Sequence, residues 1–308
     1  MARRRKGDPV SGWVCLDKPH DLGSTQAVTR VRRAFNAQKA GHAGTLDPLA
    51  TGILPIALGE ATKTVPFMMD ADKRYRFTVE WGRTTASFDR EGATTAVSNV
   101  RPSRAATAEA LAGFVGEIDQ VPPAFSAVKV AGERAYDLAR EGVTPDLAPR
   151  RVTIRAAEVT AQPDPDHVEI ALDCGKGTYV RALVRDLATA LGACGHVSAL
   201  RRTRVGGFTE DRAIRLETLE DLCNRGRPLE ALLPVETALD DIPALAVTAE
   251  DAFRLTQGRA IVLLPRQVET LKGRLSEDRT VSALHEGKIV ALCEMRAGRL
   301  NPTRVFNR

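Results

Sequence analysis

The run from Gly41 to Lys63, GHAGTLDPLATGILPIALGEATK, constrains this chain more than any other stretch. Between Gly41 and Gly52 it places one carboxylate, Asp47, among mostly small and apolar residues, where an ionised group has few local partners and is costly to remove from water. The simplest interpretation is a turn, because glycine, proline and aspartate are all turn residues and an aspartate before proline readily bonds its own backbone. The alternative is a functional carboxylate held in a pocket.

The amino-acid sequence of this run favours the second interpretation, a functional carboxylate. It resembles the catalytic segment of the bacterial tRNA pseudouridine-55 synthases, the TruB family, and four further blocks follow in the family's order. These blocks are LDKPHDLGS (Leu16 to Ser24), DKRYRF (Asp72 to Phe77), VPPAFSAVKVAGERAYDLAREG (Val121 to Gly142) and CGKGTYVRALVRDLATALGACGHVSALRR (Cys174 to Arg202). Together they cover most of the first 210 residues.

The resemblance implies roles for six residues. The catalytic ones would be Asp47, Tyr75 and Arg181, and those that hold the substrate would be His42, Tyr75, Tyr179 and Leu200. His42 would occupy the space that the flipped base leaves. Taken alone, Arg181 would be interpreted as a helix-start arginine facing solvent acids, and a lone tyrosine or leucine as core.

One position departs from the family pattern. The segment from Gly82 to Gly92 is predicted to be a loop, and relatives usually carry an aspartate where this chain has Ala86. A contact at position 86 is therefore not carried over from the family. Asp89 and Gly92 fit the pattern, and the catalytic assignment is untouched.

The implied reaction makes simple chemical demands. Converting uridine to pseudouridine breaks one bond to C1′ and forms another, so it needs a carboxylate beside the sugar and a pocket for the detached base, and we expect no cofactor. A carboxylate that stays ionised there needs a cation, which the family places at Arg181. Tyr75, Tyr179 and Leu200 would supply the stacking and apolar walls that a flipped base requires.

Other chemistries fit less well. His42 and Asp47 have no partner histidine at metal-ligand spacing, so no metal site is predicted. Gly175 to Thr178 lacks the Walker pattern of a phosphate loop. Two alternatives stay open: a uracil-releasing glycosylase, which would need an activated water near Asp47, and a non-catalytic tRNA-binding or tRNA-folding protein. A guide-RNA-dependent relative is not expected, because the chain is short and carries its own stacking residues.

Charge is concentrated rather than spread. The chain has 44 Lys and Arg against 39 Asp and Glu, a net charge of +5, with basic clusters at Arg3 to Lys6, Arg30 to Lys39 and Arg201 to Arg204. Such clusters suit a polyanion such as tRNA. The alternative interpretation is that these clusters form an ordinary solvated surface that keeps the protein soluble.

Cysteine usage and hydropathy predict a soluble, cytoplasmic protein without a membrane partner. The five cysteines are scattered and form no Cys-x-x-Cys pair, which is typical of a reducing compartment. No run of about 18 apolar residues occurs, and the segment from Met1 to Val10 is too basic and too short of apolar residues for a signal peptide. We expect a monomer.

The elements predict an α+β class with a largely antiparallel mixed sheet, which is also the pseudouridine synthase fold. Residues 74–81 alternate as a half-buried strand, 152–159 and 168–174 form a hairpin, and a helix opens at Arg181 and ends before Gly192. Further helices are expected after an N-cap at Ser24 or Thr25 and over 107–115.

The chain is long enough for two domains. A composition shift near residue 240 divides a catalytic domain, 1–242, from a small β-rich domain, 243–308. By order and length the second part resembles the PUA domain, an RNA-binding appendage of many such enzymes.

Overall fold

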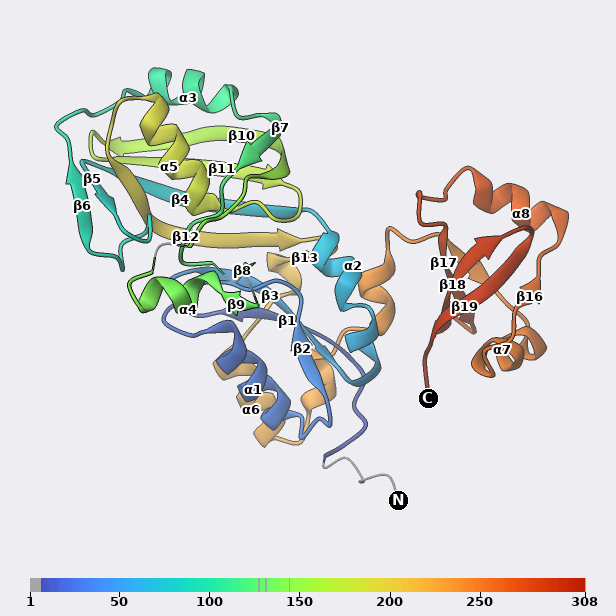
Figure 1. Ribbon diagram of the computed structural model, residues 1–308. Coiled ribbons are helices and arrows are strands. Elements are labelled where there is room, and N and C mark those ends of the chain that lie inside the picture. The colour runs from blue at the N-terminus through green and yellow to red at the C-terminus, as the bar shows by residue number, and fades with distance from the viewer. Residues whose placement is uncertain (1–6, 127, 131, 144, 308) are drawn as a thin grey trace.

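A ten-stranded mixed sheet forms the centre of the protein, in a computed structural model that describes residues 7–126, 128–130, 132–143 and 145–307 (Figure 1). Neighbouring strands pair antiparallel except β1 with β14 and β3 with β12. The predicted α+β class and its mixed, mostly antiparallel sheet are thereby confirmed. The path of the sheet is β14 (Ile214–Arg215), β1 (Gly12–Lys18), β3 (Thr51–Leu58), β12 (Gly195–Val205), β4 (Lys73–Trp81), β11 (His167–Cys174), β10 (Arg150–Asp164) and β7 (Gly116–Gln120), with β2 (Ala40–His42) beside β3 and β13 (Phe208–Thr209) beside β12.

The sheet has one face under helices and one that is partly open. Side chains of β4 alternate as predicted, with Phe77 and Val79 buried and Arg74 and Arg76 exposed. By contrast β3 is a continuous apolar run and is buried on both faces. The helices that share the main core with these strands are α1 (Ser24–Ala34), α3 (Arg104–Ala112), α5 (Val180–Ala190) and α6 (Leu216–Asn224), whereas α2 (Val65–Asp70) packs on the other side of β1 and β3.

Two predicted boundaries were wrong. The segment expected to be a loop contains a strand, because β5 (Arg83–Thr85) pairs with β6 (Thr94–Val97). The helix expected over 107–115 is α3, which begins three residues earlier because the Ser103 hydroxyl accepts from the Ala106 amide at 3.2 Å. It ends at Ala112 with Gly113 as its C-cap, so Val115 lies beyond the helix and is 45% exposed.

The long strand β12 has no counterpart among the predicted elements. Its sequence, GHVSALRRTRV, carries three arginines, and its register with β4 shifts between Val197 and Ala199 and again between Arg202 and Arg204. Each bulge puts two residues opposite one and breaks the alternation of period two by which strands are recognised.

A second, five-stranded sheet follows the main one, as the sequence predicted (Figure 1). Lys63 connects it to the main body, donating from Nζ to the Val305 carbonyl at 2.6 Å, and the Arg304 side chain donates to the Lys63 carbonyl at 3.0 Å. The elements of this unit are β15 (Ala244–Ala246), α7 (Ala249–Thr256), β16 (Ile261–Val262), α8 (Pro265–Lys272), β17 (Thr280–His285), β18 (Lys288–Arg296) and β19 (Arg299–Val305). Other short elements of the described chain are β8 (Lys129–Val130), β9 (Glu133–Arg134) and α4 (Ala135–Arg140), together with 3-10 helices at Gly59–Lys63, Glu210–Arg212, Pro228–Ala231 and Val235–Leu239.

Two further points of the sequence analysis, one on charge and one on hydropathy, can be compared with the structure. The basic cluster from Arg3 to Lys6 lies outside the described residues. Within the described part of the chain, no helix has both the length and the apolar character needed to cross a membrane.

Candidate active site

A cavity of about 660 Å³ lies between the loop that carries Asp47 and the first turns of α1 and α5. Every residue to which the sequence assigned a role lines it. These residues come from β2, the following loop, β4, the start of α5 and β12, and they are His42, Asp47, Tyr75, Tyr179, Arg181 and Leu200. The fold therefore brings together side chains that are up to 158 positions apart (from 42 to 200).

Asp47 forms an ion pair with Arg181 in the wall of this cavity. Oδ2 of Asp47 lies 2.8 Å from Nη2 of Arg181, and the arginine side chain is 5% exposed against 34% for the aspartate. The guanidinium also donates from Nη1 to the Ser87 carbonyl at 3.0 Å and from Nη2 to the Phe125 carbonyl at 2.8 Å. Arg181 is thus fixed from several sides, while the carboxylate that it holds still faces the cavity.

Behind Arg181 lies Asp89, a residue that the sequence placed in the family pattern without a role. Its Oδ2 is 3.6 Å from Nη1 of Arg181, and its side chain is 4% exposed. The Ser87 hydroxyl and the Glu91 amide donate to its Oδ1. Arg181 therefore lies between two carboxylates, one buried and one facing the cavity. Ala86, the departure from the family pattern, is exposed and belongs to neither contact.

Lys18 helps to hold the loop that carries Asp47 through hydrogen bonds to backbone carbonyls. It is fully buried, and its Nζ donates to the Leu22 carbonyl at 2.7 Å and to the Pro48 carbonyl at 3.2 Å. A third bond goes to the Pro19 carbonyl at 2.9 Å. Burial lowers the pKa of Lys18 from 10.5 to about 8, and the nearby Asp47 opposes that shift. No sequence signal other than the family block around Lys18 pointed to this support.

Ser24 corrects a prediction and adds a second support. The N-cap of α1 is Gly23, and Ser24 is the first helical residue. Its hydroxyl is used elsewhere, since it donates to the Leu46 carbonyl and accepts from the Leu46 amide, both at 2.8 Å. The start of α1 is thereby tied to the residue directly before Asp47.

The other walls are aromatic and apolar. Burial raises the pKa of the Tyr75 and Tyr179 hydroxyls, so both stay protonated at neutral pH. Burial and the neighbouring Arg202 lower the pKa of His42, which is therefore a neutral imidazole at pH 7. Phe125 and Tyr136, which the sequence did not single out, pack edge to face at 6.3 Å between ring centroids and also line the cavity.

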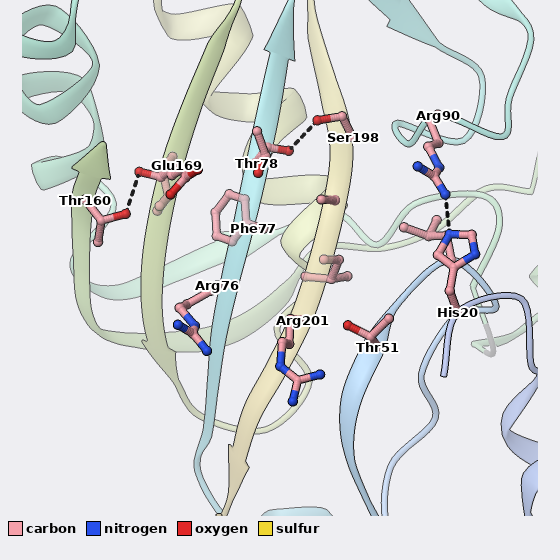
Figure 2. Close-up of a pocket in the computed structure, with 14 residues that line it drawn as sticks. His20, Thr51, Arg76, Phe77, Thr78, Arg90, Thr160, Glu169, Ser198 and Arg201 are labelled. Atoms are coloured by element: carbon pink, nitrogen blue, oxygen red, sulfur yellow. Dashed lines mark hydrogen bonds between the residues drawn. The ribbon is translucent and has the colours of Figure 1, made fainter. Parts of the chain in front are cut away.

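Figure 2 shows a second hollow, of about 280 Å³, on the partly open face of the sheet. Arg76 and Arg201 extend into it from neighbouring strands, but both are already paired with Glu210, at 3.0 and 2.6 Å. Arg201 also pairs with Asp17 at 2.9 Å. Of the predicted site residues only Leu200 borders this hollow, so the larger cavity is the candidate active site.

Within the described residues, no group of three or more His, Cys, Asp or Glu side chains is arranged to hold a metal ion. The polar groups of the larger cavity instead include an ion pair, three phenols, a neutral imidazole and buried basic side chains. Such a set can position a sugar and a base around one carboxylate.

Comparisons with known proteins agree with this geometry. Residues 32–180 match the family model described as TruB family pseudouridylate synthase (N terminal domain), and residues 181–240 match that of the tRNA pseudouridylate synthase B C-terminal domain. Curated proteins named tRNA pseudouridine synthase B, from Caulobacter sp. (strain K31) and Caulobacter vibrioides, are each 72% identical over 99% of this chain and 99% of the relative. The chain belongs to the TruB family.

Membership in the TruB family confirms the resemblance found in the sequence and makes the chain a tRNA pseudouridine synthase, an isomerase. A relative of the same name from Bradyrhizobium diazoefficiens is 54% identical over 99% of this chain and 88% of its own length. A chain of a solved Cbf5-Nop10-Gar1 complex has the same fold, with a TM-score of 0.72 and 25% identity over 96% of this TruB-family chain and 85% of that chain.

Proposed function

We propose that this TruB-family enzyme converts uridine 55 in the T loop of tRNAs to pseudouridine, by taking the base out of its stack and using Asp47 as the catalytic carboxylate. The observation that carries the proposal is the 2.8 Å ion pair between Asp47 and Arg181 in a cavity that also collects His42, Tyr75, Tyr179 and Leu200. One carboxylate, one fixed cation and aromatic walls are what the reaction demands.

The reaction balances without an added reactant. The bond from N1 of uracil to C1′ breaks, the base turns, and a bond from C5 to C1′ forms. The hydrogen on C5 leaves as a proton and N1 ends with a proton, so product and substrate are isomers. Attack on C1′, attack on the base and proton abstraction at C2′ each use the same carboxylate, Asp47.

The cavity walls would hold the base through these steps. Stacking on an aromatic ring stabilises a flipped base by about 1–3 kcal/mol, which is similar to the cost of flipping. We assign this role to Tyr75 and Tyr179, with Leu200 as an apolar wall and neutral His42 filling the vacated stack. Tyr75 is counted with Asp47 and Arg181 as catalytic because it lies beside the reacting base.

The two parts of the chain would divide the work. Residues 1–242 would carry the chemistry, and residues 243–308, the PUA-like part, would bind tRNA phosphates. The enzyme would act as a monomer and without a guide RNA. A chain that ends at residue 242 should still convert a T-loop hairpin, but it should bind whole tRNA more weakly and with a shallower salt dependence. A folded truncation that is inactive on the hairpin would contradict this division.

A label on C5 of uracil tests the reaction class. Given tRNA transcript tritiated at C5, the enzyme should release tritium to water without freeing uracil, because only formation of the C5–C1′ bond expels that hydrogen. The assay runs with a chelator and without added nucleotide. Free uracil would instead show a glycosylase, and tight binding without tritium release would show a tRNA-binding or tRNA-folding protein.

A further inference from the structure

Arg202 is a buried arginine that the roles assigned above do not use. Its side chain is 1% exposed and lines the active-site cavity. Among the described residues it forms no ion pair with a carboxylate, unlike its neighbours Arg201 and Arg204. Burying a guanidinium without an opposite charge is costly unless its hydrogen bonds are satisfied, so the contacts that satisfy it are informative.

The contacts of the Arg202 guanidinium go to the backbone on both sides of Asp47. Nη2 donates to the Gly44 carbonyl at 3.0 Å, and Nη1 makes a longer contact with the Thr45 carbonyl at 3.5 Å. Nε donates to the Ile53 carbonyl at 2.8 Å. One rigid, planar group thus joins the segment that enters the catalytic loop to the strand that leaves it.

Two glycines let the loop approach Arg202 this closely. Gly52 has φ +97°, and a Cβ there would lie 2.2 Å from the Arg202 carbonyl oxygen. Gly44 has φ +102°, and a Cβ there would lie 3.3 Å from Nη1 of Arg202. Both backbone conformations favour glycine. The sequence of the loop is therefore adapted to the strand that carries the arginine.

Arg202 also contacts Tyr75. The two residues are register partners on β12 and β4, both line the cavity, and the charge of Arg202 opposes the rise that burial causes in the pKa of the Tyr75 hydroxyl. Directly opposed side chains on one face of an antiparallel pair are close enough to orient each other. The guanidinium therefore bonds the loop that carries the carboxylate and lies beside the ring that borders the base.

We propose that Arg202 is a positioning residue for the isomerisation, whose guanidinium fixes the Asp47 loop and the Tyr75 ring in one relative arrangement. The proposal rests on the proposed function, because the benefit of this arrangement is realised when Asp47 and Tyr75 face the same uridine. Arg202 does not touch the reacting atoms in this role. A misplacement of about 1 Å in such a site can cost a factor of about 100 in rate.

The test compares three variants of the full chain. Arg202→Met removes every hydrogen bond of the guanidinium, and Arg202→Lys keeps the charge and reaches fewer carbonyls. Arg201→Met is the matched control, because Arg201 is the adjacent arginine of the same strand and extends into the second hollow (Figure 2). The readouts are the single-turnover tritium-release rate at saturating tRNA, the Kd for tRNA, and hydrogen exchange of the Ala43 and Ala50 amides, which are bonded within and beside the loop.

We expect Arg202→Met to slow the single-turnover step about 100-fold with the Kd changed by no more than a few fold, and to speed exchange of both loop amides. Arg202→Lys should recover part of the rate, and Arg201→Met should stay within about twofold of the unmodified enzyme in single-turnover rate and loop exchange, because its side chain bonds Asp17 and Glu210 rather than the Asp47 loop. If Arg202→Met does not fold, Arg202→Lys must still show a slower step and faster loop exchange.

Three results would overturn the proposal: an unchanged rate per folded molecule, unchanged loop exchange in both Arg202 variants, or a loss of rate explained entirely by weaker tRNA binding. Failure of the proposed function has a different signature, since the unmodified enzyme would then release no tritium. The exchange measurement would still report whether Arg202 fixes the loop.

Discussion

Arg201 and Arg202 are consecutive residues of β12, yet their charged side chains differ in both exposure and hydrogen-bond partners. Arg201, 31% exposed, pairs with Asp17 and Glu210 on the partly open face of the sheet. Arg202, 1% exposed, donates to backbone carbonyls around the active-site cavity. Exposed pairs are screened and contribute little to stability, whereas a buried cation bonded to a loop holds that loop in one geometry.

The same contrast separates the active-site cavity from the second hollow described above. The active-site cavity is lined by three buried cations, Lys73, Arg181 and Arg202, each bonded to main-chain oxygens, and Lys18 holds the Asp47 loop beside it. The hollow on the other face is bordered by Arg76 and Arg201, which both pair with Glu210, and by Arg90, which contacts His20. Changes on the cavity face should therefore affect chemistry, and changes on the other face should have little effect.

The largest expected effect follows from Asp47→Asn. This change keeps the size of the side chain and removes its charge, so turnover should fall below detection while the Kd for tRNA stays within a few fold. Single-turnover assays and filter binding on the same preparation measure both quantities. Substantial pseudouridine formation by this variant would contradict the comparison between the two faces, because activity in the cavity would then not depend on the Asp47 carboxylate.

Arg181→Met should have the next largest effect. Losing one preorganised charged contact typically costs about 100- to 1,000-fold in rate, and here it also releases Asp47 and leaves Asp89 without its buried partner. The single-turnover rate should fall by that range, and thermal stability should fall as well, because an unpaired buried carboxylate is costly. A rate within a few fold of the unmodified enzyme would show that Arg181 is only structural.

A moderate effect is expected from pH, through Lys18. Because its pKa in the folded protein is lowered from 10.5 to about 8, Lys18 is charged at pH 7 and loses its proton as pH rises through about 8. The neutral amine has two hydrogens for three carbonyls, so the Asp47 loop should loosen and the rate should decline. Over the same range the unfolded chain binds more protons than the folded one at this site, so the contribution of Lys18 to stability rises with pH.

Lys73 provides the control for this alkaline decline. Lys73 also lines the cavity, and burial also lowers its pKa to about 8, but its Nζ donates to the Met68, Met69 and Ala71 carbonyls at the end of α2 rather than to the Asp47 loop. The decline should persist in Lys73→Met and disappear in Lys18→Met, which should be slow at every pH. Rate profiles from pH 6 to pH 10 distinguish the two lysines, and the reverse pattern would assign the decline to Lys73.

The smallest effect is expected from Arg76→Met on the partly open face. This side chain is 61% exposed and pairs with Glu210, which keeps Arg201 as its other partner. The single-turnover rate should stay within about twofold and the melting temperature should change little, since exposed ion pairs are worth about 0–1 kcal/mol. A large loss of rate would contradict this expectation and would show that tRNA also contacts the partly open face.

The sequence was sufficient to predict the residues of the candidate site that lie in segments resembling the motifs of the family. The run around Asp47 and the blocks holding Tyr75, Tyr179 and Arg181 predicted the residues that line the cavity, and the alternation over 74–81 predicted β4. These signals work because they are local in the chain.

What could not be predicted depends on contacts across the fold. The run from Arg201 to Arg204 looked like one basic cluster, but in β12 its side chains divide between the cavity and the open face, and two bulges hid the strand. Lys18 and Arg202 bond to carbonyls up to 158 positions away (from 44 to 202), and no local pattern reports a carbonyl partner. Ser24 looked like a cap because its use by Leu46 is a tertiary contact.

The most direct test of the central claim locates the product in the tRNA. A complete tRNA transcript is incubated with the enzyme, treated with a carbodiimide that leaves a stable adduct on pseudouridine, and copied by reverse transcriptase, which stops at the adduct. One new stop is expected, caused by an adduct on nucleotide 55, and none when another base replaces uridine 55. Pseudouridine at any other nucleotide, or unchanged formation in the substituted tRNA, would contradict the account.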